Sequence, residues 1–332
     1  MKIAAVACFS NELALAGAFR DQLETFFDKS YLVSHNTYDK TADLFLDSNK
    51  FAVNVVKDPI FRQAELVSVE MVRAFEEGAD WVIFLDFDEF LPLSGRGELE
   101  VFLNEHEEKD VVSWRWQTIY PETLGHPEIF KRKFFTIPDA AIDRKVIISK
   151  RAYEKDPNLL VSHGSHEQIS NKKMDVHFEE KFKLIHLIIH GLDHFKQKIL
   201  IRQISSYGPG FFDDRIEEYI SSGSISEEVL RNYALTSGIK DFPDYEASIF
   251  DFDFPYITSQ YVNEKESAID SLFGAIYLNL LTKDVITNNN SNTEEYMGQL
   301  TAKAMMQSRS WKITRPLRAI NRLVKAIKSL KS

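Results

Sequence analysis

The 332-residue chain is 44% hydrophobic and 27% charged, a composition typical of soluble globular proteins that excludes disorder of the whole chain. Its one cysteine, Cys8, excludes an internal disulfide and a cysteine-based zinc site. The net charge of −10 is uneven: residues 309–332 carry eight Lys or Arg side chains and no acid, whereas the rest carry 32 basic and 50 acidic ones. An acidic body argues against a general nucleic-acid binder, and a basic end suits contact with an anionic surface.

The first 90 residues alternate apolar runs with amphipathic segments. The runs predict a buried strand at Ile3–Phe9 and further strands at Tyr31–Ser34, Phe51–Val56 and Trp81–Leu85, the last almost wholly apolar. Apolar spacings of three and four predict helices over Leu13–Phe27, with Leu15, Phe19, Leu23 and Phe26 on one face, and over Gln63–Glu77, with Leu66, Val69, Val72 and Phe75 on one side. Such alternation predicts right-handed βαβ units and a parallel sheet, whose ligands bind at the carboxyl ends of the strands.

Beyond residue 95 the pattern loosens. Further strands are predicted at Val111–Trp116, Lys145–Ser149 and His186–Ile189, with an irregular stretch over Thr118–Asp143 that could shape a pocket. A helix is expected over Asp193–Ser206, and helical patterns dominate from Phe211 onward, with a turn-rich interruption at Asp241–Pro255. No apolar run reaches the roughly 18 residues that crossing a bilayer requires. We expect three parts: an α/β domain over residues 1–206, a helical extension over 207–307 and a basic amphipathic tail over 308–332.

Three acids, Asp86, Asp88 and Glu89, directly follow the apolar run at Trp81–Leu85. Burying them at the end of a strand is costly unless a cation neutralises them. On an extended chain, Asp86 and Asp88 would project to the same side. Paired carboxylates suit Mg²⁺ or Mn²⁺, which could in turn bridge the oxygens of a diphosphate. The alternative interpretation is a solvated acidic turn.

The stretch Gly78–Phe90, which reads GADWVIFLDFDEF, strongly resembles the family 2 glycosyltransferases of the GT-A fold. It is most similar to the bacterial branch in which an Asp-x-Asp-Glu-Phe element follows a strand that begins with Asp-Trp. The pair Asn11-Glu12 after the first strand and Arg62-Gln63 before the second helix fit the same family. The resemblance implies a Rossmann-like, mostly parallel sheet over about residues 1–206, a nucleotide-diphospho-sugar donor and a Mn²⁺ or Mg²⁺ cofactor.

The loop after the second strand reads HNTYDKT from His35 to Thr41. The family usually shows Asp-Asn-x-Ser-x-Asp-x-Thr there, so this loop is one residue shorter and has His35 in place of the nucleotide-contacting Asp. The resemblance implies that the loops after the first three strands recognise the donor, around Asn11, Asn36 and Asp39, with Arg62 beside them.

Six of the nine histidines lie between residues 163 and 194. The run His163-Gly164-Ser165-His166 resembles the family's Gly-x-His element, with His166 at the matching position. His190 resembles the histidine that the family has at the end of a strand. Lys198 and Arg202 lie eight and twelve residues after it, at positions where the family has polar residues. The resemblance implies that His166 or His190 completes the metal shell, and Lys198 and Arg202 could neutralise the diphosphate. Hydrogen-bonded structural histidines and a solvated helix face are the alternatives.

The basic end forms an amphipathic pattern from Pro316 onward. Its apolar side carries Leu317, Ile320, Val324, Ile327 and Leu330, which predicts a helix lying in a membrane interface. The run from Ser310 to Arg318 also resembles a terminal segment frequent in bacterial surface-polysaccharide glycosyltransferases. We expect a cytoplasmic protein, peripheral on the inner face of the plasma membrane. The alternative is a helix that packs on the acidic body.

Together these features predict a glycosyltransferase that moves a sugar from a nucleotide-diphosphate donor to a hydroxyl of a cell-surface glycan, which could be lipid-linked. The resemblance implies inversion, with a metal at Asp86 and Asp88 acting as a Lewis acid. Glu167 is our candidate for the base that takes the acceptor proton, with Glu122 and Asp193 behind it. The rival interpretations are a metal-dependent hydrolase built from the aspartates and histidines, and a non-catalytic carbohydrate-binding protein.

Overall fold

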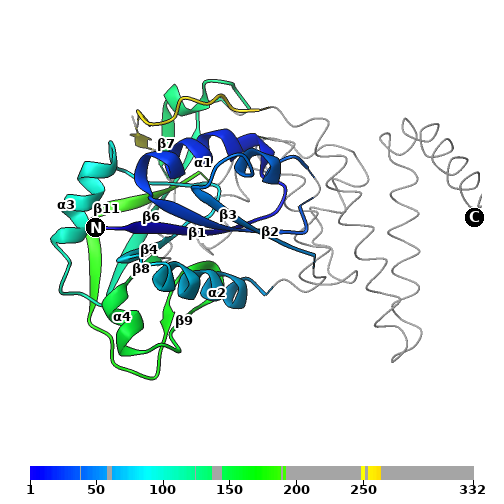
Figure 1. Cartoon of the computed structure of the whole chain (residues 1–332). Helices are drawn as coiled ribbons and strands as arrows, with labels where there is room; N and C mark the ends of the chain where they lie inside the picture. The colour runs from blue at the N-terminus through cyan, green and yellow to red at the C-terminus, as the bar shows by residue number, and fades with distance from the viewer. Residues whose placement is uncertain are drawn as a thin grey trace, which may run out of the picture.

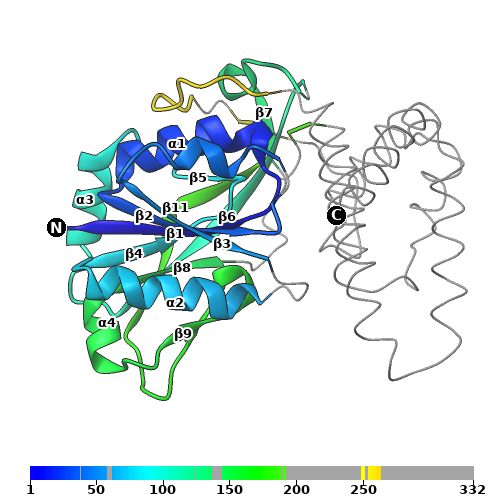
Figure 2. The ribbon, with the colours of Figure 1, turned by 45° about the vertical axis from the view of Figure 1, so that its right-hand side comes forward.

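The computed structural model describes residues 1–37, 39–57, 62–123, 125–136, 144–187, 190–191, 248–250 and 253–262. These residues form one twisted sheet with helices on both faces (Figure 1). Helices α1 (Leu13–Phe26) and α3 (Arg96–Asn104) cover one face, whereas α2 (Gln63–Glu76) and α4 (Lys150–Lys155) cover the other, as Figure 2 shows. No helix among the described residues has the length and apolar character that a bilayer crossing requires.

The first four strands form a parallel half-sheet in the order β3-β2-β1-β4. They are β1 (Ile3–Phe9), β2 (Lys29–His35), β3 (Phe51–Val56) and β4 (Trp81–Phe84). Helix α1 links β1 to β2 on one face, and α2 links β3 to β4 on the other. The chain therefore changes its direction across the sheet between β1 and β4. In open α/β sheets, the crevice at such a switch point, beyond the carboxyl ends of the strands, is where ligands bind.

The remaining strands make the sheet mixed. β8 (Arg144–Ser149) lies antiparallel between β4 and β6 (Val111–Pro121), and β6 pairs antiparallel with β7 (Phe134–Thr136) and parallel with β11 (Val176–Leu187). β5 (Glu89–Phe90) pairs with β11, β12 (Ser248–Phe250) pairs with β7, and β9 (Leu160–Val161) with β10 (Gln168–Ile169) forms a separate hairpin. Short 3₁₀ turns span Ala42–Phe45, Ile129–Lys131 and His163–Ser165. The expected α/β sheet is confirmed, with its parallel part confined mainly to the first four strands.

The predicted buried face of α1 is confirmed, whereas that of α2 is only partly right. Leu15, Phe19, Leu23 and Phe26 are all buried, as expected from their spacing. In α2, Phe75 is buried and Leu66 and Val72 pack half-buried against the core as expected, but Val69 is 62% exposed. The buried side of the helix also includes Gln63, Val67, Ser68, Glu70, Met71 and Ala74. The buried arc is shifted because β9 also packs on this helix, where the Val161 N–H donates to the Ser68 hydroxyl.

The stretch over 118–143 is more regular than expected. β6 continues to Pro121, and a 3₁₀ turn and β7 follow it, while residues 137–143 lie outside the described residues. Likewise β11 begins at Val176, ten residues before the strand predicted at 186–189, of which residues 188 and 189 are not described.

Residues 248–250 and 253–262 fall within the predicted helical extension but take part in the α/β sheet and its core. β12 lies at the sheet edge, and Phe254, Tyr256 and Ile257 are buried against the α1 face. The Tyr256 hydroxyl lies 3.0 Å from the Leu91 carbonyl oxygen and 3.2 Å from Gln22 Oε1. The rest of the predicted extension and the tail over 308–332 lie outside the described residues, so the membrane contact stays a sequence-based prediction.

Candidate functional site

The acidic segment after β4 folds into a tight turn. The Glu89 N–H donates to the Asp86 carbonyl oxygen at 3.0 Å, and Glu89 Oε2 accepts a hydrogen bond from the Asp86 N–H at 2.8 Å. The expectation of an extended chain here is therefore wrong. The reason lies in Phe87, which is 2% exposed and stacks on Phe19 with 4.1 Å between ring centroids. Burying this ring against the α1 face turns the chain back on itself, so that Glu89 begins β5.

The turn is not a solvated acidic loop, because Asp88 is 5% exposed and Glu89 is fully buried. A neutralising cation comes from the chain itself. Lys145 Nζ lies 2.7 Å from Asp86 Oδ2 and 3.3 Å from Glu89 Oε2. This lysine begins the predicted strand at 145–149, and no local pattern indicates that it pairs with the acidic turn. Its position follows from the antiparallel pairing of β8 with β4, which sets Ile147 opposite Ile83 and brings Lys145 level with the end of β4.

The two charged partners of the turn respond differently to burial. Burial raises the pKa of the Glu89 carboxyl well above its usual range, and the charges of Asp86 and Asp88 add to the effect against the opposing influence of Lys145. Burial alone would lower the pKa of Lys145, but Asp86 and Glu89 raise it overall. The acidic neighbours therefore favour the charged form of Lys145, whereas burial opposes the charge of Glu89. The turn thus holds three carboxyl groups beside one ammonium.

Two side chains that we did not predict as site residues line the turn. The Leu187 N–H donates to the Asp88 carbonyl oxygen at 2.8 Å, which sets His186 Nε2 3.7 Å from Asp88 Oδ2. The Trp116 ring packs against His186 with 4.3 Å between centroids and lies 5.9 Å from Lys145 Nζ. Within the described part of the chain, Glu89 Oε1, Trp116 Nε1 and His186 Nδ1 are buried without a hydrogen-bond partner. Buried polar atoms of this kind are rare in folded proteins, and a bound ligand, ion or water is one explanation for them.

His166, a predicted metal ligand, lies on the same wall. Its ring is 5.2 Å from that of Trp116, and its Nδ1 lies 2.8 Å from the Arg144 carbonyl oxygen. That contact assigns the proton to Nδ1 and leaves Nε2 as an acceptor or ligand atom. The glycine of the Gly-x-His element has a clear role, because Gly164 has φ +72° and an added Cβ would lie 2.3 Å from His166 Nε2. The element therefore fixes the position of this imidazole.

The loops after β1 and β2 interlock at the carboxyl ends of the strands. Asn11 Oδ1 accepts a hydrogen bond from the Asp39 N–H at 3.3 Å, and the Ser10 hydroxyl donates to the Asn36 carbonyl oxygen at 3.4 Å. Asp39 Oδ2 accepts from the Leu13 N–H at 3.2 Å and its Oδ1 accepts from the Thr41 N–H at 2.9 Å. The structure thus brings together Asn11, Asn36 and Asp39 as expected, with both Asp39 oxygens engaged by backbone.

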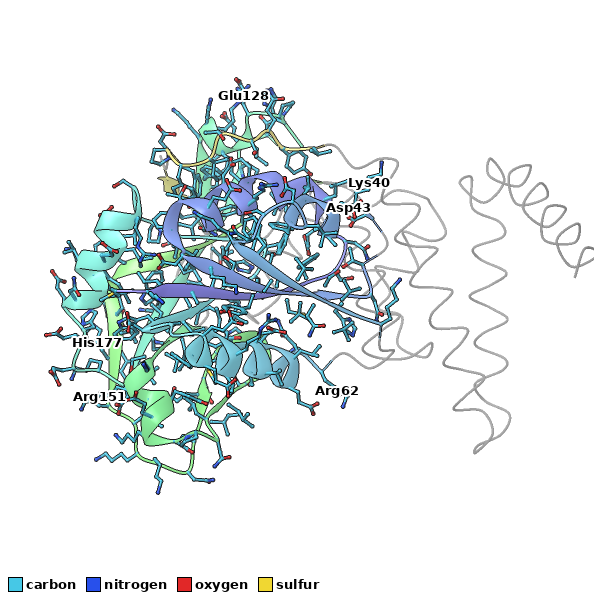
Figure 3. All side chains as sticks on the ribbon, viewed as in Figure 1. Lys40, Asp43, Arg62, Glu128, Arg151 and His177 are labelled. Atoms are coloured by element: carbon cyan, nitrogen blue, oxygen red, sulfur yellow. The ribbon has the colours of Figure 1, made fainter. Side chains whose placement is uncertain are left out.

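Other predicted residues are placed less centrally. His190 is 1% exposed, and its Nδ1 lies 3.3 Å from the Tyr261 hydroxyl. Glu167 and Glu122 are exposed, and Glu167 follows His166 directly. Arg62 lies 3.2 Å from Glu65 at the start of α2. Figure 3 shows it on the side of the molecule that also carries Lys40 and Asp43.

Three predicted residues, Asp193, Lys198 and Arg202, lie outside the described residues. One group of three possible metal ligands in the described chain has its ligand atoms within 4.8 Å of one another, namely His106, His177 and Glu179. Asp86 and Asp88 do not form so close a group with His166 or His190 there. Two carboxylates, with the unpartnered Glu89 Oε1 beside them, still offer the oxygen ligands that Mg²⁺ and Mn²⁺ prefer. The donor set therefore fits a hard cation, although Lys145 already engages Asp86.

No family model matches the chain, and no curated protein matches it. Among solved structures, S. aureus TarS 1-349 is similar at 11% identity and a TM-score of 0.37, over 70% of this chain and 79% of that one. The same protein in complex with UDP matches at 13% identity and a TM-score of 0.37, over 70% and 78%. A putative nucleotide-diphospho-sugar transferase from Desulfovibrio desulfuricans G20 matches at 12% identity and a TM-score of 0.31, over 62% and 90%. These similarities concern the fold alone.

Proposed function

We propose that the chain is a metal-dependent glycosyltransferase, with a nucleotide-diphospho-sugar as donor and a hydroxyl of a cell-surface glycan as acceptor. One observation carries the proposal: the buried turn Asp86–Glu89 lies at the carboxyl end of β4, at the switch point of the sheet. The interlocked loops that hold Asn11, Asn36 and Asp39 end beside it. The resemblance of residues 78–90 to family 2 glycosyltransferases supports the same reading.

The polar groups at the turn suit a diphosphate. Lys145 supplies a buried positive charge, and Trp116 Nε1 and His186 Nδ1 are buried atoms without a partner in the described chain. An indole N–H can donate to a phosphate oxygen, and so can an imidazole that carries its proton on Nδ1. A Mn²⁺ or Mg²⁺ ion held by Asp86 and Asp88 would neutralise negative charge on the diphosphate leaving group.

The acceptor side requires a base that takes the proton of the attacking hydroxyl. Glu167 is our candidate, because it is exposed and adjoins His166, whose ring packs against Trp116. Inversion at the anomeric carbon follows from the resemblance and belongs to the same proposal. The competing hydrolase would need the aspartates and the histidine pairs His163/His166 and His190/His194 to converge on one or two metals. Asp86 and Asp88 form no close group with His163, His166 or His190, and His194 lies outside the described residues.

The donor can be identified by thermal unfolding of the full-length protein with a panel of nucleotide-sugars, with and without Mn²⁺. We expect one donor to raise the midpoint only when Mn²⁺ is present. Asp88→Asn should lose this shift and lower kcat/KM for transfer by about 10²–10³-fold, as when one stabilising group for a developing charge is removed. Asp43→Asn is the matched control, because Asp43 is an exposed carboxylate in the 3₁₀ turn after β2 and is none of the proposed site residues.

Two outcomes would contradict the proposal. Full transfer activity of the Asp88→Asn protein in excess EDTA would show that the reaction needs no metal at this turn. Stabilisation by a glycan alone, with no response to any nucleotide-sugar and no turnover, would favour the carbohydrate-binding alternative.

A further inference from the structure

A second cluster of potential metal ligands lies on the opposite edge of the sheet from the acidic turn. It consists of His106, which follows α3, and of His177 and Glu179 at the start of β11. β8 pairs antiparallel with both β4 and β6, so β6 points in the same direction as β4, and β11 is parallel to β6. The start of β11 therefore lies at the end of the sheet where these strands begin, whereas the acidic turn lies where β4 ends. Figure 3 shows His177 on the left of the molecule and Arg62 on the right.

The distances within this His-His-Glu cluster fit a metal better than they fit hydrogen bonds. Nε2 of His106 lies 3.6 Å from Glu179 Oε2, and Nε2 of His177 lies 3.4 Å from the same oxygen. An N–H···O bond is usually 2.7–3.2 Å long, so the contact of His177 with Glu179 is a long hydrogen bond and that of His106 is longer still. Ligands about 2.0–2.2 Å from a tetrahedral Zn²⁺ are about 3.4 Å from one another. All three ligand atoms lie within 4.8 Å of each other.

The fold holds the carboxylate in place. The pairing of β11 with β6 is irregular between Glu179 and Leu184. Within this bulge, Glu179 Oε1 accepts hydrogen bonds from the Lys181 N–H and, at 3.1 Å, from the Phe182 N–H. Those two donors leave Oε2 directed at the histidines. Glu179 is thus buried, at 6% exposed, yet keeps one oxygen for a ligand.

The imidazoles are also positioned by packing. The His106 and His177 rings stack with 4.1 Å between centroids, and Phe102 packs edge-on against His106 at 4.9 Å. Trp114 packs against Phe102 and extends the apolar floor. Such an apolar shell limits the access of water to a metal. The His177 side chain is 34% exposed, so one side of the cluster stays open to solvent.

We propose that His106, His177 and Glu179 bind a divalent transition metal of the Zn²⁺ class, separate from the cation site at Asp86 and Asp88. Two imidazoles and one carboxylate are an established ligand set for Zn²⁺, with a water in the fourth position. The metal would tie the connection after α3 to the start of β11 and so stabilise the sheet. The inference does not depend on the proposed transferase activity.

The alternative is that the cluster binds no metal and that a protonated histidine forms an ion pair with Glu179. It predicts no metal affinity and a stability that changes only with pH. The choice between the two is therefore a direct measurement of Zn²⁺ binding.

Zn²⁺ binding should be measured on the full-length Asp88→Asn protein after dialysis against EDTA, so that the acidic turn does not contribute. We expect one Zn²⁺ per chain and, at 100 times the dissociation constant, a rise in the unfolding midpoint of about 5–10 °C. Adding Glu179→Gln should abolish both, because it keeps the oxygen that accepts the backbone hydrogen bonds and replaces the ligand oxygen by an amide nitrogen. Co²⁺ should give a visible absorption band that the same change removes.

Glu180→Gln is the matched control, since Glu180 is the next residue on β11, is exposed and pairs with Arg115 and Arg144. It should leave Zn²⁺ binding unchanged. His177→Asn is the second test, in case Glu179→Gln does not fold, because His177 is only partly buried. The proposal is overturned if Asp88→Asn binds no Zn²⁺, or if the Glu179 and His177 variants bind it as tightly as the Glu180 variant.

Discussion

Replacing Lys145 by methionine tests whether this ammonium neutralises the acidic turn. Methionine preserves most of the apolar stem and removes the charge. The ion pair with Asp86, at 2.7 Å, is worth about 6 kcal/mol at an effective dielectric constant of about 20, before the desolvation of the two ions is subtracted. Removing one partner of a buried pair costs about 3–5 kcal/mol. Because the Asp86 side chain is 32% exposed, we expect a loss near the lower limit, about 3 kcal/mol at pH 7.

The loss should depend on pH. Burial already holds the pKa of the Glu89 carboxyl above its ordinary value, and removing the opposing charge of Lys145 raises it further, so the folded variant binds more protons than the unfolded chain. The stability of the variant is then lost as pH rises through that folded pKa, and its deficit against wild type should be smaller at pH 5 than at pH 7. Urea unfolding at both pH values measures this. Lys109→Met is the control, because Lys109 forms an exposed pair with Asp175 that should contribute about 0–1 kcal/mol.

A Lys145→Met protein within about 1 kcal/mol of wild type at pH 7, or with the same deficit at both pH values, would refute this reasoning. The variant should also bind Mn²⁺ more tightly than wild type, because the ammonium no longer competes for Asp86. Isothermal titration of the two proteins with Mn²⁺ gives the comparison, and a weaker affinity in the variant would show that the lysine does not compete.

Two further predictions concern single groups. A hydrogen bond from Lys29 is the main reason why the pKa of Glu77 falls to about 2, below the ordinary 4.5, so its contribution is present above pH 4.5 and is lost as pH falls through about 2. The free energy of unfolding of Glu77→Gln should approach that of wild type as pH falls from 6 to 2. A difference between the two proteins that stays constant over this range would contradict the assignment. Burial, with the charge of Asp86 adding to it, raises the pKa of the Cys8 thiol to about 12, so a thiol reagent at pH 8 should label only the unfolded protein; rapid labelling of the native protein would count against this.

Local patterns were sufficient for the parallel half of the sheet. Ile3–Phe9 has the bounds that its apolar run predicted, because a strand buried on both faces is apolar throughout and ends at polar residues. Phe51–Val56 also has its predicted bounds, although β3 lies at the edge of the sheet and only its Phe51 is buried. The spacing in α1 likewise identified its buried face, since one layer of the sheet covers it. In α2 the same reasoning wrongly placed Val69 on the buried side, although it faces solvent. The helix also contacts β9, a segment about 90 residues away in the sequence, which the local spacing cannot reveal.

The sequence by itself located the acidic turn at the end of β4, since three acids after an apolar strand are recognisable in any register. It could not identify Lys145, Trp116 or His186, whose approach to the turn depends on the pairing of β8, β6 and β11. The same pairing brings His106 within reach of His177 and Glu179. Strand periodicity tells which face a side chain takes, but the register of non-consecutive strands is set only when the core packs. Tertiary structure therefore decided which groups neutralise the carboxylates and which histidines meet.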